Sequence, residues 1–124
     1  NYMLFKPKRI KKTKDDYVKV LAFSNRIKDF NTSNIEKLLL EHAQNLSPHE
    51  TDKTFIITKL EDDMFIYKIE YVFSFNDTES IYKKLEFVKP EKNTLKFLTY
   101  ITEKNIFEKY YDDAMSIINS IEKR

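Results

Sequence analysis

The sequence predicts an α+β domain in which an antiparallel β-meander sheet of about five strands packs against two helices, in the order β-α-β-β-β-β-α. Three observations lead to this prediction. Residues 65–75 carry an aromatic residue or Ile at every odd position, and a strand points alternate side chains to opposite faces. Two stretches, near residues 35–46 and 107–121, repeat apolar residues at spacings of three and four, as amphipathic helices do. Asn, Asp and Pro residues, which favour turns, separate the remaining alternating stretches.

The first strand is predicted at Tyr17–Phe23, where apolar side chains lie on both faces. A helix follows from Ile35, because Ser33 and Glu36 have the spacing of a capping box. Pro48 prevents this helix from continuing. The predicted apolar stripe of the helix consists of Ile35, Leu38, Leu39, His42 and Leu46.

The second strand is predicted at Lys53–Leu60, and the acidic residues 61–63 form a tight reversal after it. The aromatic stretch Phe65–Phe75 follows. Its odd positions form one continuous apolar row, so we expect it to be the central strand of the sheet. We also expect both helices to gather on the apolar face of the sheet, with the closing helix over this strand.

Two more strands complete the meander, at Ile81–Val88 and Leu95–Ile101, with a polar loop at 89–93 between them. One long helix is then predicted at Glu103–Glu122, with Thr102 or Asn105 as its N-cap. Its wide apolar stripe is suited to packing across a sheet. The stripe consists of Phe107, Tyr110, Tyr111, Ala114, Ile117, Ile118 and Ile121.

Composition excludes several classes of function. The 124 residues, 41% of them hydrophobic, are enough for one core. The chain has no Cys, which excludes disulfides, thiolate metal sites and thiol nucleophiles. It has no Gly either, which excludes glycine-rich phosphate loops and the nucleophile elbow of serine hydrolases. No apolar run reaches the roughly 18 residues expected of a membrane-spanning helix.

Charge divides the chain into a basic N-terminal arm, residues 1–14, and a single domain, residues 15–124. The arm carries six basic residues and no acid, so the rest of the chain has 16 of the 22 basic residues against all 20 acidic ones. We consider first a solubilising tail, then a membrane-proximal segment that contacts anionic headgroups, and last a nucleic-acid contact. The candidate contacts to an anionic surface are Lys8, Arg9, Lys11, Lys12 and Lys14.

Catalytic and metal-binding residues are few. His42 and His49 are the only histidines, and neither has the spaced His and Glu partners of a metal site. His42 is therefore predicted to be a partly buried structural residue. The acidic pairs in residues 61–63 and 112–113 are too few for a Ca²⁺ site and are predicted to be solvated. We expect a protein that is not an enzyme and that has no cofactor.

An aromatic sheet face under a long helix can also enclose an apolar ligand. This alternative predicts a small carrier protein with a cavity between the sheet and the C-terminal helix. The predicted lining residues are Phe65, Tyr67, Tyr71 and Phe107.

The order of the predicted elements and the pattern of the second half of the chain resemble the Mog1/PsbP-like fold, which includes PsbP-like and DcrB-like proteins. The residues that carry the resemblance are the strands at 64–75, 81–88 and 95–101, the segment Phe107–Tyr110 and the terminal stretch Ile117–Ile121. It covers residues 16–122, although this chain has none of the Gly residues common in the family's hairpin turns. The resemblance implies a non-enzymatic accessory or binding domain, exported or membrane-anchored, with an unknown protein partner. No functional residue is carried over from the family.

Overall fold

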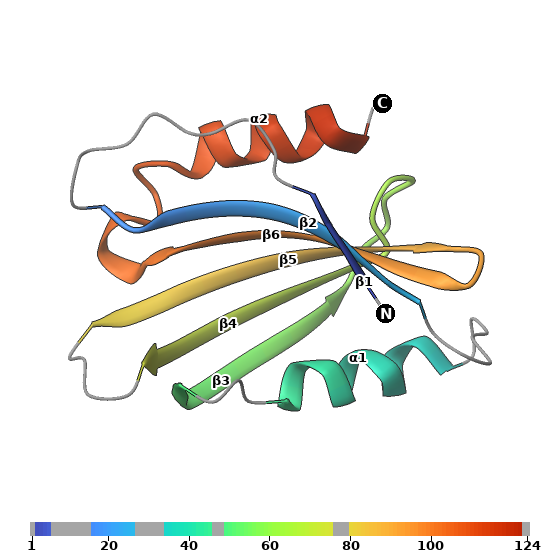
Figure 1. The fold of residues 1–124 in the computed structure, drawn as a ribbon, viewed down its shortest axis with the longest axis horizontal. Coiled ribbons are helices and arrows are strands. Elements are labelled where there is room, and N and C mark those ends of the chain that lie inside the picture. Colours follow the sequence, from blue (N-terminus) through green and yellow to red (C-terminus); the bar gives the residue numbers. More distant parts are fainter. Residues whose placement is uncertain (1, 6–15, 27–33, 46–48, 76–79, 123–124) are drawn as a thin grey trace.

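A computed structural model describes residues 2–5, 16–26, 34–45, 49–75 and 80–122 of the chain. The described segments form six strands, two α-helices and a short 3-10 helix (Figure 1). In chain order, these elements are β1 (Tyr2–Phe5), β2 (Val18–Arg26), α1 (Ile35–Gln44), β3 (Glu50–Lys59), β4 (Tyr67–Phe75), β5 (Ile81–Glu91), β6 (Thr94–Glu103), η2 (Lys104–Ile106) and α2 (Tyr111–Glu122).

The strands form one antiparallel sheet in the order β1-β2-β6-β5-β4-β3. The predicted α+β class, with its β-α-β-β-β-β-α order, is confirmed. β1 adds a strand next to β2, so part of the N-terminal arm belongs to the sheet. Within the described residues, no helix combines the length and the apolar character needed to cross a membrane.

The aromatic strand is not the central strand, contrary to the sequence-based expectation. β4 lies second from one end, between β3 and β5, and the middle of the sheet is formed by β5 and β6. The reason is the position of β2, which pairs with β6 and not with β3, its neighbour in sequence. The chain crosses the sheet between β2 and β3, and α1 lies in this crossing (Figure 1).

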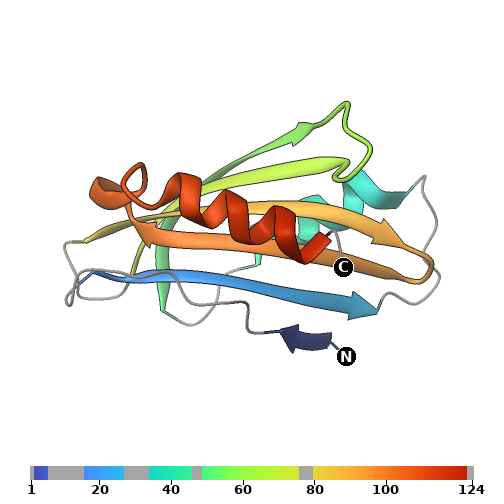
Figure 2. The same cartoon turned by 90° about the horizontal axis from the view of Figure 1, so that it is seen from above.

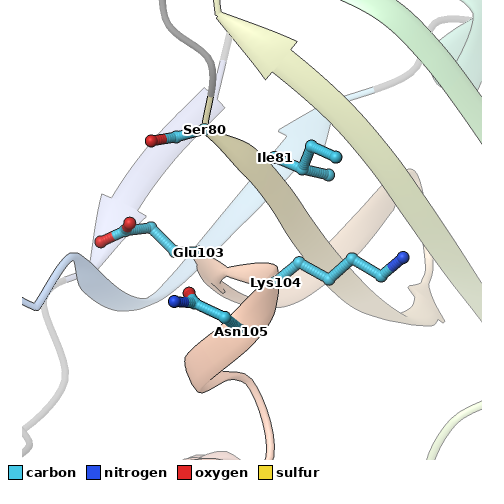
Figure 3. Close-up of a pocket in the computed structure, with 5 residues that line it drawn as sticks. All are labelled: Ser80, Ile81, Glu103, Lys104 and Asn105. Atoms are coloured by element: carbon cyan, nitrogen blue, oxygen red, sulfur yellow. The ribbon is translucent and has the colours of Figure 1, made fainter.

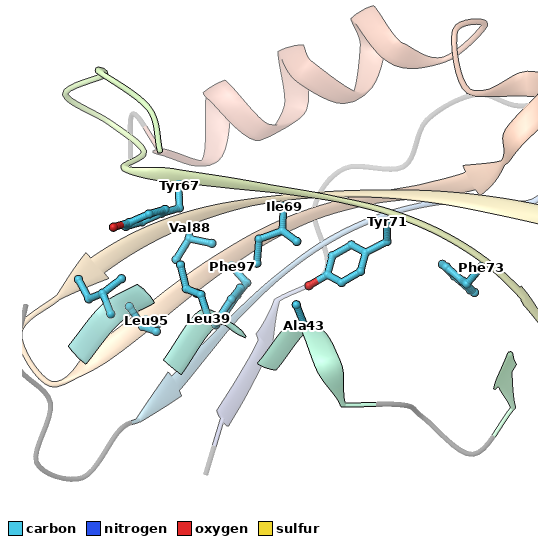
Figure 4. Packing of buried hydrophobic residues seen from close by; sticks show 10 residues of the cluster. Leu39, Ala43, Tyr67, Ile69, Tyr71, Phe73, Val88, Leu95 and Phe97 are labelled. Carbon is cyan, nitrogen blue, oxygen red and sulfur yellow. The ribbon is translucent and has the colours of Figure 1, made fainter. Parts of the chain in front are cut away.

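The two helices cover opposite faces of the sheet, and this corrects the prediction that both gather on one face (Figures 1 and 2). The apolar row of β4 points toward α1 (Figure 4), whereas α2 runs along β6 on the other side. This is possible because β5 and β6 are apolar on both faces. The α1 side is built from Ile35, Leu39, Ala43, Tyr67, Ile69, Tyr71, Phe73, Val88, Leu95 and Phe97. The α2 side is built from Ala22, Phe65, Leu85, Leu98, Tyr100, Phe107, Tyr110, Ala114 and Ile118.

Phe65 leaves the aromatic row of which it was predicted to be the first member. The ladder between β4 and β5 begins at Tyr67, opposite Val88, and the N–H of Ile66 also donates to the carbonyl of Val88, at 3.0 Å. Two successive residues therefore face one partner, an irregularity that breaks the alternation of faces. As a result, Tyr67 packs on the α1 side and Phe65 on the α2 side, against the Phe87 ring.

Several boundaries differ from the prediction. The predicted loop at 89–93 is mostly strand, because β5 continues to Glu91 and only Lys92 and Asn93 form the turn. The predicted closing helix is shorter, since Glu103 pairs with Tyr82 in the sheet and α2 begins only at Tyr111. Buried Phe107 lies in the connection, its ring 4.7 Å from that of Tyr100 between centroids.

The predicted N-cap of the first helix, Ser33, lies outside the described residues. Asn34 precedes α1 and makes no capping hydrogen bond with its side chain. Glu36, the predicted capping-box partner, instead accepts a hydrogen bond of 2.9 Å from the hydroxyl of Tyr67. This bond joins the first turn of α1 to β4. Burial is the main cause that raises the pKa of the Tyr67 hydroxyl, and Glu36 adds to it, so the group stays a donor at neutral pH.

Candidate functional site

The most unusual side chain in the described structure is a buried carboxylate, that of Glu86. It lies on β5, with only 2% of its surface exposed. Alternation along β5 places Glu86 on the same side as Tyr82 and Val88, facing α1. Acidic residues are almost never fully buried unless they are paired, so its partners determine what this site does.

Three donors from three different elements satisfy the carboxylate. The Nε2–H of His42, on α1, donates to Oε1 of Glu86 at 3.0 Å, and the hydroxyl of Tyr71, on β4, donates to the same oxygen. The hydroxyl of Thr99, on β6, donates to Oε2 at 3.2 Å. The cluster of Glu86, His42, Tyr71 and Thr99 is called the Glu86 cluster below. It connects α1 with the three strands beneath it.

The surroundings keep Glu86 ionised. Burial alone would raise the pKa of the Glu86 carboxyl, but the His42 hydrogen bond and the positive charge of Lys84 outweigh it, with a smaller contribution from Tyr71. The net result is a pKa below the ordinary value of 4.5. Burial, followed by the adjacent Glu86 charge, raises the pKa of the Tyr71 hydroxyl far above its ordinary value. Tyr71 therefore stays protonated and serves as a fixed donor.

Two lysines flank the Tyr71 ring. Lys84 Nζ lies 4.3 Å and Lys53 Nζ 5.5 Å from the ring centroid, within the range of cation–π attraction. Lys53 Nζ also donates to the carbonyl of Asn45, just after α1. Burial lowers the pKa of Lys53. Positive charge is thus concentrated beside the buried carboxylate, and this favours its ionised form.

The Glu86 cluster has part of a catalytic triad but lacks its nucleophile. In a triad, a carboxylate orients a histidine, and the histidine accepts a proton from a hydroxyl or thiol. Within the described part of the chain, no hydroxyl is hydrogen-bonded to the His42 ring; Tyr71 and Thr99 donate to Glu86 itself. The His42 ring instead stacks on Phe97, with centroids 4.4 Å apart. The arrangement is suited to holding α1 on the sheet.

His42 is partly buried, as predicted, with 27% of its side chain exposed. The sequence reasoning did not find its partner, because Glu86 lies 44 residues away in the chain. His49, the other histidine, is exposed directly before β3 and is not part of the Glu86 cluster.

The four aromatic residues predicted to line a ligand cavity do not face one space. Tyr67 and Tyr71 belong to the α1 side of the sheet, and Phe65 and Phe107 to the α2 side. All four are buried. The sheet itself lies between the two pairs, so this prediction is wrong as a description of a single cavity. Two features cause this: the break in alternation before Tyr67 moves Phe65 to the other face, and the C-terminal segment with Phe107 covers the face opposite α1.

The other predicted site residues lie at the surface or outside the described structure. Lys8, Arg9, Lys11, Lys12 and Lys14 fall outside the described residues, so their role at an anionic surface stays a prediction. Residues 61–63 are exposed, and Asp62 Oδ1 accepts a hydrogen bond of 2.6 Å from the N–H of Met64. Asp112 and Asp113 are exposed in the first turn of α2. No group of three potential metal ligands occurs within the described part of the chain.

An open depression of about 530 Å³ lies where β5 begins and β6 ends (Figure 3). Its lining includes Glu103, Lys104 and Asn105 from the end of β6 and η2, with Ser80 and Ile81 opposite. These residues are mainly polar, and none belongs to the predicted aromatic lining. The depression is therefore a different site from the cavity predicted between the sheet and the C-terminal helix.

The outer strand β3 presents the most exposed large hydrophobic side chain among the described residues. Ile56 is 65% exposed, and Thr54 and Thr58, on the same face, are exposed as well. In the sheet that the described residues form, β3 is the last strand, and β4 is its one strand partner there. The ladder is irregular between Thr51 and Thr54, and Asp52 has a φ of 51°. The regular stretch at residues 54–58 is called the β3 outer edge below.

The chain matches no protein-family model and no curated protein sequence. The Mog1/PsbP-like assignment, and the export that it implies, stay predictions.

Proposed function

We propose that this protein is a non-enzymatic interaction module and that it binds a protein partner through the β3 outer edge. The observation that supports this most directly is the exposure of Ile56 in a strand that ends the sheet. An edge strand presents unpaired N–H and C=O groups that can pair with a further strand. Recognition by strand addition uses these groups for affinity and the alternate side chains for specificity.

The composition of the edge favours such pairing. Residues 54–58 are Thr, Phe, Ile, Ile and Thr, all types that are enriched in strands. Natural edge strands are commonly protected by Pro, by inward-pointing charges or by bulges. Here the irregularity at Asp52 and the two flanking lysines, Lys53 and Lys59, border the edge but do not interrupt it. The accessible part of this edge is therefore short, and both of its ends are defined.

The Glu86 cluster supports the same proposal because the hydrogen bonds of its carboxylate are all made inside the protein. Its carboxylate accepts from three donors, and Tyr71 is almost fully buried. A catalytic group must reach a substrate within hydrogen-bonding distance, and this carboxylate lies beneath α1. We therefore assign the cluster to the stability of the fold, and we assign partner binding to the surface.

Site-specific photo-crosslinking in cells that produce the full chain tests this function. A photoreactive amino acid at Ile56 should give defined adducts, whereas the same group at Leu40 on α1, which is 43% exposed, should not. The captured protein is then purified, and its affinity is measured for the wild type and for Ile56→Lys. At least a tenfold loss in the variant is expected, because a charge would enter the apolar centre of the edge. Identical adducts from both positions, or none from Ile56, would refute the proposal.

A further inference from the structure

We propose that the occupant of the β3 outer edge is the same edge of a second copy of this chain, paired antiparallel about a two-fold axis at Ile56. This inference rests on the proposed function and names its partner. Homodimers with two-fold symmetry use the same surface patch on both subunits, so the patch must be complementary to itself. The β3 outer edge meets this condition in its sequence.

The self-complementarity follows from residues 54–58, Thr-Phe-Ile-Ile-Thr. An antiparallel register centred on Ile56 places Thr54 opposite Thr58, Phe55 opposite Ile57, and Ile56 opposite its own copy. Aromatic and β-branched pairs, and Thr–Thr pairs, are favourable cross-strand neighbours. Every position in this window thus meets a residue of compatible type.

The faces of the strand agree with this register. Ile56, Thr54 and Thr58 are exposed on one face, where the two copies of Ile56 would cover each other. Phe55 and Ile57 lie on the other face and pack against the α1 side of the core. Pairing would therefore join the two apolar layers into a sheet that continues across the dimer axis, and would remove the exposed Ile56 surface from water.

The length of the edge limits the assembly to a closed dimer. The ladder irregularity and the positive φ of Asp52 end regular pairing on one side, and β3 ends at Lys59 on the other. At the opposite end of the sheet lies β1, a strand of four residues. Each copy offers one β3 outer edge, and a two-fold pairing uses both edges completely, so no open filament follows.

The charges at the two ends of residues 54–58 give the proposed dimer a salt dependence that can be tested. Just outside the regular stretch, this register brings Lys59 of each copy near Lys53 of the other, where the ladder irregularity begins. Like charges in neighbouring strands are unfavourable, so salt should strengthen the dimer by screening them. An acidic partner strand on the same edge would show the opposite salt dependence. Replacing Lys59 by Glu would turn both repulsions into attractions.

Analytical ultracentrifugation of the full chain, from micromolar to millimolar concentration, tests the inference. The wild type should show a monomer–dimer equilibrium that tightens with salt. Lys59→Glu should tighten it by about tenfold, since two like-charge pairs become ion pairs, and Ile56→Lys should abolish dimers. Leu40→Lys, at an exposed apolar position of α1, is the matched control and should dimerise like the wild type. Circular dichroism establishes that each variant is folded.

The absence of Cys from the chain permits a direct test of the register. Ile56→Cys introduces a single thiol, and opposite positions in antiparallel strands have Cβ atoms about 5 Å apart, close to disulfide geometry. Mild oxidation should give a covalent dimer of Ile56→Cys, and much less of Leu40→Cys.

Two results would overturn the inference of a second copy. In the first, the wild type and Lys59→Glu both stay monomeric at every concentration. In the second, dimers form but Ile56→Lys does not weaken them. The failures can be told apart. Monomers together with Ile56 adducts to a different protein would refute only the second copy, whereas monomers without position-specific adducts would refute the proposed function too.

Discussion

The hydroxyl of Tyr71 donates a hydrogen bond to Oε1 of Glu86 across two neighbouring strands in the interior. The two residues are not directly opposite: Tyr71 is paired in register with Lys84, two residues before Glu86. The diagonal contact lets one carboxylate oxygen accept from β4 and from α1 at once, because His42 donates to the same atom. Together with the Thr99 bond to Oε2, a single charged group therefore connects α1 with three strands.

Removing this charge should destabilise the fold. Glu86→Gln keeps the side-chain shape but directs an amide NH₂ at one or more of the three donors. We expect the free energy of unfolding to fall by about 3 kcal/mol, the usual effect of breaking a buried charged network. Urea unfolding at neutral pH measures the change. Glu91→Gln, at an exposed residue of the same strand, is the control and should change stability by less than about 0.5 kcal/mol. Similar effects of both substitutions would contradict the role given to Glu86.

The pH dependence of stability should report the same group. The pKa of Glu86 in the folded chain lies below its ordinary value, so the unfolded chain binds its proton more readily. The resulting stabilisation is present above the unfolded pKa and is lost as pH falls through the folded pKa. We expect the urea midpoint to fall from pH 6 to pH 3, and to fall less steeply in Glu86→Gln. Parallel pH profiles for both proteins would show that Glu86 does not contribute.

The strand faces and the fold class could be predicted from the sequence, but the pairing of strands could not. Alternation along residues 81–88 places Leu85 and Phe87 on one side and Val88 on the other, and the structure has the same arrangement. The pairing of β2 with β6 depends on contacts between distant segments, and no local pattern specifies them. Similarly, the irregularity before Tyr67 that sends Phe65 to the other face depends on backbone pairing with Val88.

The Glu86 cluster was missed because a charged residue in an alternating strand is ordinarily taken to face water. A signal was nevertheless present. Glu86 shares its strand face with Tyr82 and Val88, and His42 interrupts the apolar stripe of a helix. Two polar residues on two otherwise apolar faces indicate a buried pair when those faces meet. What the sequence could not show is which helix meets which face.

The placement of the two helices on opposite faces can be tested by additivity. Leu39→Ala, on α1, and Ile118→Ala, on α2, each remove a buried side chain and should each cost about 2–4 kcal/mol. The sheet separates the two positions, so the double substitution should equal the sum within about 0.5 kcal/mol. Urea unfolding of the four proteins gives the comparison, with a more tolerant variant such as Leu39→Val if the double variant is unfolded. A larger coupling would mean that the two side chains share one packed layer, contrary to the structure.

Glycine, which this chain lacks, should stabilise the turn between β5 and β6. Lys92 has a φ of 42°, a conformation that costs a non-glycine residue about 1 kcal/mol or more. Lys92→Gly should therefore raise the free energy of unfolding by about 0.5–1 kcal/mol, although the added flexibility of the unfolded chain offsets part of the gain. Asn93→Gly is the matched control, because the only positive φ values among the described residues belong to Asp52 and Lys92. It should leave stability unchanged or lower it, since glycine there adds only unfolded-state entropy. A stabilisation by Asn93→Gly, or a loss with Lys92→Gly, would mean that the hairpin turns through a different residue.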